Sequence, residues 1–276
     1  MKIHMTVTPG KARFIAAALL LLLLALWELF VRQSGLSALV LPAPSAVAAA
    51  LWSGLTSGYF WPHISATLQA LMLGLVAGSA FGLLVGMALA ESELLALVLK
   101  PYVVVSQVVP KLALAPLFVL WFGFGMLPTV LITALICFFP LMENTLTGLK
   151  QVDAQRLQLF RMLGATRLQT LLRLKLPTAL PAILAGLRVA VVLALVGVVV
   201  AEFMGASKGL GAVVIAAQGM MDTTLMFAAL VIIAAIGLLL YQACLLLERR
   251  LLRAHASSDT FSDSFSNPSS RSGRKP

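Results

Sequence analysis

Long apolar segments separated by short polar stretches constrain the fold of this chain more than any other feature. A transmembrane helix needs about 20 consecutive, predominantly apolar residues. Of the 276 residues, 61% are hydrophobic and only 11% are charged, whereas a soluble domain carries about a quarter charged residues. The sequence therefore predicts an all-α membrane protein with six transmembrane helices, near residues 14–31, 66–90, 102–125, 127–149, 179–203 and 223–247.

The third of these segments is interrupted. Pro110 and Pro116 divide it, and Lys111 places a charge inside an apolar stretch. A charge deep in lipid is costly, so Lys111 must face protein, a water-filled cleft or the membrane edge. We expect Lys111 to lie at the cytoplasmic edge of the membrane, with the span itself beginning near Leu112. A broken span of this kind is tolerated where it packs within protein.

The distribution of basic residues predicts the orientation. With the amino terminus inside, 18 of the 20 Lys and Arg residues fall on the inner side, and only Arg32 and Lys208 fall outside. Cytoplasmic loops are enriched in these residues. We therefore expect both termini in the cytoplasm, with a cytoplasmic tail at 1–13, a periplasmic connector at 32–65 and a disordered cytoplasmic tail at 255–276. A net charge of +10 is explained by these loops without invoking nucleic acid as a partner.

The longest polar interruption, residues 150–188, contains signals for two short helices. Asp153 is a candidate N-cap, and Gly164 suits the position after a helix end, where a left-handed backbone is needed. Thr166 followed by Gln169 is a capping-box pattern that starts a second helix near Arg167. Pro177 is expected to end that helix, because proline lacks the backbone donor. Thr178 would then cap the following transmembrane helix.

This loop resembles the cytoplasmic coupling loop of the permease subunits of binding-protein-dependent ABC importers. The family signature is Glu-Ala-Ala, three residues, Gly, nine residues, Ile, one residue, Leu-Pro. Gly164 is followed by nine residues and then by Leu174, Lys175, Leu176 and Pro177, while Gln158, Leu159 and Phe160 replace the Glu-Ala-Ala triplet. The continuation from Pro181 to Arg188 resembles the branch that imports nitrate, sulfonates and taurine.

The resemblance implies a type I ABC-importer permease that is multi-pass in the inner membrane, with a permease core at 66–254 and a coupling loop at 150–178. Its partners would be a cytoplasmic ATPase dimer, an extracytoplasmic substrate-binding protein, a second copy of this chain and the lipid bilayer. The solute would be a sulfonate, nitrate, taurine or a pyrimidine-like precursor. The coupling-loop residues carried over are Gln158, Phe160, Gly164, Ala165, Leu174, Pro177 and Pro181.

The second span carries glycine at every fourth position. Gly74, Gly78, Gly82 and Gly86 share one helical ridge, and ridges without side chains let two helices approach closely in lipid. We expect this ridge to pack against a neighbouring span of the same chain. A direct contact between two copies is the alternative.

Catalytic machinery is not evident in the sequence. It lacks the Gly-x-x-x-x-Gly-Lys-Ser/Thr phosphate cradle, so energy must come from a partner or an ion gradient. We predict a non-catalytic subunit without cofactor or metal. The alternative is a proton-coupled secondary transporter that uses Glu143, Glu202 and Asp222 as relays, although all three lie near span ends.

Overall fold

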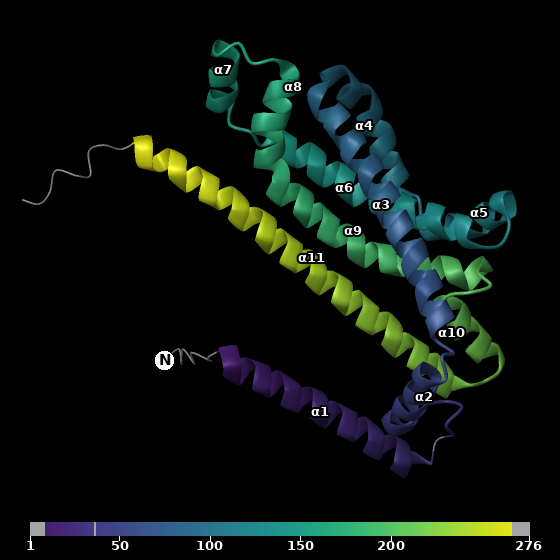
Figure 1. Ribbon diagram of the computed structural model, residues 1–276. Helices are drawn as coiled ribbons and strands as arrows, with labels where there is room; N and C mark the ends of the chain where they lie inside the picture. The colour runs from purple at the N-terminus through teal and green to yellow at the C-terminus, as the bar shows by residue number, and fades with distance from the viewer. Residues whose placement is uncertain (1–8, 36, 267–276) are drawn as a thin grey trace, which may run out of the picture.

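The computed structural model describes residues 9–35 and 37–266, and the regular structure in these ranges is entirely helical (Figure 1). The predicted tails at 1–13 and 255–276 lie partly outside the described residues. The elements are α1 (Pro9–Ser34), α2 (Pro44–Thr56), α3 (Trp61–Glu91), α4 (Glu93–Val108), the 3-10 helix η1 (Lys111–Leu114), α5 (Ala115–Phe122), α6 (Met126–Lys150), α7 (Ala154–Met162), α8 (Arg167–Thr170), the π-helical segment η2 (Leu171–Lys175), α9 (Leu176–Gly205), α10 (Leu210–Gly219) and α11 (Thr223–Ser266).

Six candidate spans are present if a bent pair is counted as one. Five helices are long and apolar enough to cross a membrane, and α4 together with η1 and α5 passes the same test as a pair bent by 82°. The bend follows from the sequence: α4 ends at Val108, and Pro110 precedes η1. By the length and composition of the helices, the prediction of six spans with a broken third one is confirmed.

The centre of the bundle is built from α3, α6 and α9. Buried residues from all three helices belong to one hydrophobic cluster that includes Ala70, Leu71, Cys137, Leu141, Ala190, Ala194 and Val198. The glycine ridge of α3 lies against α6 of the same chain. A Cβ added at Gly78 would stand 2.8 Å from the Cα of Ala134, and one at Gly82 would stand 3.0 Å from the Cβ of Leu141. Side chains at these positions would push the two helices apart.

Helix α11 lies beside this centre, and α1 lies outside it, away from α3, α6 and α9 (Figure 1). The rings of Trp27 and Phe227 approach with centroids 5.8 Å apart, which joins the two helices directly. Glu28 accepts hydrogen bonds from the backbone N–H and the hydroxyl of Ser45, at 3.0 and 2.8 Å, and so connects α1 to the first turn of α2. The connector at 32–65 is thus largely ordered around α2.

Residues 255–266 of the expected disordered tail continue helix α11. Helix α11 runs 44 residues without interruption to Ser266, and residues 267–276 lie outside the described part. Between Gly237 and Pro268 the sequence has neither glycine nor proline. Once a helix is nucleated, each added residue gains a hydrogen bond, so a polar segment without breakers can continue it.

The corner expected at Pro177 does not form, so this prediction is wrong. Residues Arg167–Gly205 form one continuous apolar helix of 39 residues that includes α8, η2 and α9. The π-helical turn Leu171–Lys175 ends one residue short of Pro177, and such local widening accommodates proline in a membrane helix. Thr178 does not cap a new helix: its hydroxyl donates to the carbonyl of Leu174 at 2.7 Å, within the same helix.

Candidate functional site

The loop between α6 and α9 leaves the bundle as a short helix that stands apart from the others, at the top of Figure 1. We call this end of the molecule the loop end. Asp153 caps α7 by accepting a hydrogen bond from the backbone N–H of Gln155 at 3.0 Å, which confirms the predicted cap. No residue of α7 is buried. This helix therefore offers nearly all of its surface for contact with another molecule.

Gly164 turns the chain between α7 and α8. Its φ of +71° is in the left-handed region, which a residue with a side chain adopts at a cost. The backbone N–H of Ala165 donates to the carbonyl of Phe160 at 3.0 Å, and that of Gly164 donates to Arg161 at 3.0 Å. These bonds close the end of α7 in the manner of a Schellman motif. Apart from its chain neighbours, a Cβ at Gly164 would meet no atom of the described residues within 4 Å.

The capping box at the start of α8 is confirmed. The hydroxyl of Thr166 accepts from the backbone N–H of Gln169 at 3.2 Å, and the side-chain oxygen of Gln169 accepts from the backbone N–H of Thr166 at 2.9 Å. Two backbone donors that the helix leaves unpaired are thereby satisfied. The corner and the box together fix α7 relative to the long Arg167–Gly205 helix.

The residues carried over from the family signature divide into two groups. Gln158 and Gly164 are exposed and Phe160 and Ala165 are half-buried, and all four belong to α7 and its corner. Leu174 is buried within η2, while Pro177 and Pro181 lie inside the first turns of α9. The structure therefore brings the first group to the surface and places the second in the helix that leads into the bundle.

Two features of this loop were not found from the sequence. Met162, Leu163 and Leu168 are 79%, 72% and 63% exposed, so apolar side chains face outward beside Arg161 and Arg167. The second feature is an ion pair of 2.6 Å between Lys175 in η2 and Glu91 at the end of α3. The exposed apolar residues could have been inferred from their place in a short polar loop. The ion pair joins positions 84 residues apart, and no local signal indicates it.

A polar cavity of about 570 Å³ lies at the base of the loop. Glu91 and Glu93 line it from α3 and α4, and Arg161, Arg167 and Lys175 line it from the loop and η2. Three basic and two acidic side chains thus surround a hollow between the loop and the bundle. This arrangement connects the surface of the loop to the end of α3 and the start of α4.

At the opposite end of the bundle, Glu202 is buried at the end of α9. Its carboxylate accepts from the hydroxyl of Thr67 on α3 at 2.7 Å and from the backbone N–H of Gly211 at 2.7 Å. The hydroxyl of Thr67 in turn accepts from the backbone N–H of Leu210 at 2.8 Å. The carboxylate therefore binds the first turn of α10, where a negative charge is favourable. Asp222 likewise accepts from the backbone N–H of Leu225 at the start of α11.

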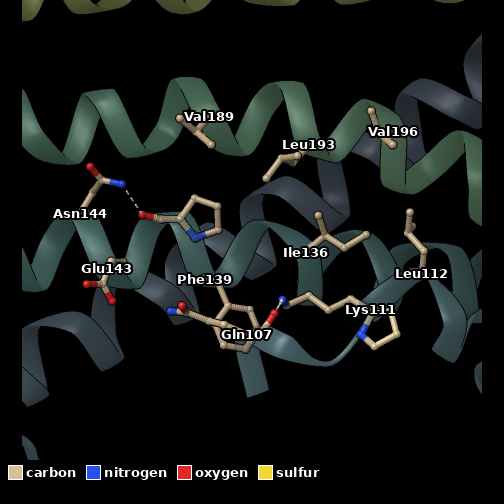
Figure 2. Close-up of a pocket in the computed structure, with 12 residues that line it drawn as sticks. Gln107, Lys111, Leu112, Ile136, Phe139, Glu143, Asn144, Val189, Leu193 and Val196 are labelled. Carbon is tan, nitrogen blue, oxygen red and sulfur yellow. Dashed lines mark hydrogen bonds between the residues drawn. The ribbon is translucent and has the colours of Figure 1, made fainter. Parts of the chain in front are cut away.

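A second hollow, of about 510 Å³, lies between the end of α4, η1, α6 and α9 (Figure 2). Its walls are mainly apolar, and Lys111 extends into it with its ammonium group 4.3 Å from the ring centroid of Phe139. Phe139 lies near the middle of α6, about 20 Å from its first residue at 1.5 Å per residue. Of the surroundings considered for Lys111, the structure therefore shows a side chain that faces protein. The helix break at Pro110 directs it into the pocket.

Comparison with known proteins decides the family. Residues 78–253 match the family of binding-protein-dependent transport system inner membrane components. The chain belongs to this family. It is 40% identical over 238 residues to the riboflavin transport system permease protein RibX of Chloroflexus aurantiacus, covering 86% of this chain and 89% of RibX. It is 35% identical over 241 residues to the taurine transport system permease protein TauC of Escherichia coli, covering 86% and 88%.

A solved structure supports the fold. A permease chain of the MetNI methionine ABC transporter, in an inward-facing conformation, superposes with a TM-score of 0.60 at 19% identity, covering 70% of this chain and 94% of that chain. The chain is thus an all-α, multi-pass inner-membrane permease subunit of an ABC importer. It is not itself the ATPase, since hydrolysis belongs to a partner protein in this family. The predicted family is confirmed.

Proposed function

We propose that two copies of this chain form the translocation path of an ATP-driven importer, and that α7 and α8 dock on a cytoplasmic ATPase. The observation that carries the proposal is the exposed surface of α7, which has no buried residue and stands apart from the bundle. Exposed apolar side chains of Met162, Leu163 and Leu168 beside basic ones are typical of a docking surface rather than of a solvated loop.

The orientation belongs to the same proposal. The loop end would face the cytoplasm, where an ATPase is present, and the end that carries α2 and α10 would face the periplasm. The excess of Lys and Arg in the loop supports this assignment. A substrate-binding protein would then deliver solute at the periplasmic end.

The long helix suggests how ATPase movement could reach the solute path. The Arg167–Gly205 helix is continuous over 39 residues, which corresponds to about 58 Å. It begins in the proposed docking loop and ends at Gly205, three residues beyond Glu202, at the opposite end of the bundle. A displacement of α8 would therefore be transmitted to the far end as the movement of one rigid element.

The solute belongs to the proposal as well. Relatives are named for riboflavin and for taurine, so the family admits chemically different solutes. A small organic or inorganic solute, such as a sulfonate, nitrate, taurine or a pyrimidine-like precursor, would be delivered by the binding protein.

The test is uptake energetics in cells that express this chain with its ATPase and binding protein. We expect uptake that is blocked by vanadate and that survives a protonophore while ATP is maintained. Pull-down of the ATPase with the tagged permease is measured in the same membranes. Uptake that collapses with the proton gradient, or a permease that never retains the ATPase, would favour the secondary transporter instead.

A further inference from the structure

The pocket in Figure 2 contains a cation that the fold does not neutralise. Lys111 is the only basic residue among the 12 that line it. No carboxylate lies within 4.0 Å of its ammonium group in the described residues, and its contacts there are the carbonyl of Gln107 at 3.4 Å and the face of Phe139. A charged side chain within a membrane span is expensive to keep, and it marks a solute or ion path by default.

The surroundings of Lys111 are suited to a small organic molecule. Leu112, Ile136, Val189, Leu193 and Val196 supply apolar walls, and the volume of about 510 Å³ is within the range of small-molecule sites. The pocket lies at the break between α4 and η1, and solute sites in transporters are commonly built at interrupted helices. Figure 2 shows Lys111 reaching from this break toward α6, with the apolar residues of α9 above it.

A carboxylate lies on the other side of the same pocket. Glu143 lines it one helical turn beyond Phe139, and Figure 2 shows it at the opposite end from Lys111, close to Asn144. A solute with one negative charge could place that charge at Lys111 and its apolar body along α9. A second negative charge at the far end of the solute would approach Glu143 and be repelled.

We propose that the Lys111 pocket is a solute subsite for small organic monoanions with an apolar body, such as a sulfonate or carboxylate, and that Glu143 selects against dianions. The inference rests on the proposed function, because it places the pocket on the translocation path. It adds to that function a charge class for the solute and names the residue that recognises it.

The first experiment titrates the purified permease–ATPase complex and follows its melting temperature at constant ionic strength. The probes are butane-1-sulfonate, the uncharged butyramide and the dianion butane-1,4-disulfonate. We expect a saturable rise with the monosulfonate and little change with the other two. Lys111→Met should abolish the rise, while Lys111→Arg should retain it. Lys100→Met, which removes an exposed lysine outside the pocket, should behave as wild type.

A rise of equal size with butyramide, or in the Lys111→Met complex, overturns the proposal. If Lys111→Met does not assemble, Leu193→Trp fills the pocket and leaves the charge in place, and it should also abolish the effect. Persistence of the monosulfonate effect in an assembled Leu193→Trp complex counts equally against the pocket.

A second experiment needs no ATPase and separates this inference from the proposed function. Leu193→Cys, in a chain whose Cys137 and Cys244 are replaced by serine, is labelled in membranes with an anionic and a cationic methanethiosulfonate reagent. Lys111 should favour the anionic reagent, and Lys111→Met should lower the ratio of the two rates on the order of tenfold. An unchanged ratio overturns the inference. Loss of ATPase retention with an intact ratio would instead count against the proposed function.

Discussion

Lys175 and Glu91 form an ion pair of 2.6 Å that joins the π-helical segment before α9 to the last residue of α3. Both side chains are largely shielded from solvent, with 18% and 29% of their surfaces exposed. At the opposite ends of the same two helices, the hydroxyl of Thr67 donates to Glu202 at 2.7 Å. Polar contacts therefore connect α3 to the Arg167–Gly205 helix at both ends, with α6 packed between them.

Removing the Lys175–Glu91 pair should uncouple the loop from the bundle. Lys175→Met or Glu91→Gln removes an ion pair of roughly 1 kcal/mol or less, so the permease should still insert and fold. We expect basal ATP hydrolysis to persist and its stimulation by the loaded binding protein to fall several-fold. The double variant Lys175→Glu with Glu91→Lys should restore most of the stimulation. Full stimulation in both single variants would show that the pair carries no coupling.

Gly164 gives a test of the docking surface. Gly164→Asp must adopt a left-handed backbone, at roughly 1 kcal/mol, but its Cβ points into open space among the described residues. We expect normal membrane abundance and loss of ATPase co-purification. Gly58→Asp is the matched control, because Gly58 has a φ of +84°, open space around it and a position at the opposite end. Equal ATPase retention in the two variants would remove Gly164 from the contact.

Close packing at Gly78 predicts a large effect from a single methyl group. Gly78→Ala places a carbon against the backbone of Ala134, and overpacking of this kind costs about 1–3 kcal/mol. Gly219→Ala adds the same methyl at the end of α10, where no atom lies within 4 Å. We expect a lower melting temperature for the first variant and no loss for the second. Similar melting temperatures would mean that α3 and α6 separate easily at this point.

A substitution at Glu202 can distinguish a structural role of this carboxylate from a role as a proton relay. Glu202→Gln replaces one of the two acceptor oxygens with an NH2 donor, so either the N–H of Gly211 or the hydroxyl of Thr67 loses its acceptor, and a buried polar group left unpaired costs about 1–3 kcal/mol. We expect reduced stability but retained uptake per folded molecule. The secondary-transporter hypothesis predicts the reverse, with full abundance and abolished uptake. Measurement of both quantities in the same membranes decides between them.

The orientation can be tested with two introduced cysteines. Ser57 follows α2 at one end of the bundle, and Gln169 lies in α8 at the other. An impermeant thiol reagent added outside should label Ser57→Cys and spare Gln169→Cys until the membrane is opened. The native Cys137 and Cys244 are buried and should contribute little background. Labelling of Gln169→Cys alone would reverse the proposed topology.

Local signals in the sequence were sufficient for much of this fold. The length of apolar runs indicated the spans, because a helix must satisfy its backbone polar groups internally within lipid. Asp153, Gly164 and the Thr166–Gln169 box indicated the ends of the loop helices, because caps depend on residues three to five positions apart. The four-residue spacing of the glycines in α3 indicated a close helix contact, because residues four positions apart lie on the same face of a helix.

Features that depend on distant residues were decided only by the tertiary structure. The pair Lys175–Glu91 and the contact of Thr67 with Glu202 join residues 84 and 135 positions apart, which no local pattern encodes. Pro177 suggested a corner, yet the π turn before it lets the helix continue. The sequence allowed three surroundings for Lys111, and the break at Pro110 turns it over Phe139 on α6. The sequence determined which segments are helices, and packing among them determined where their few polar side chains point.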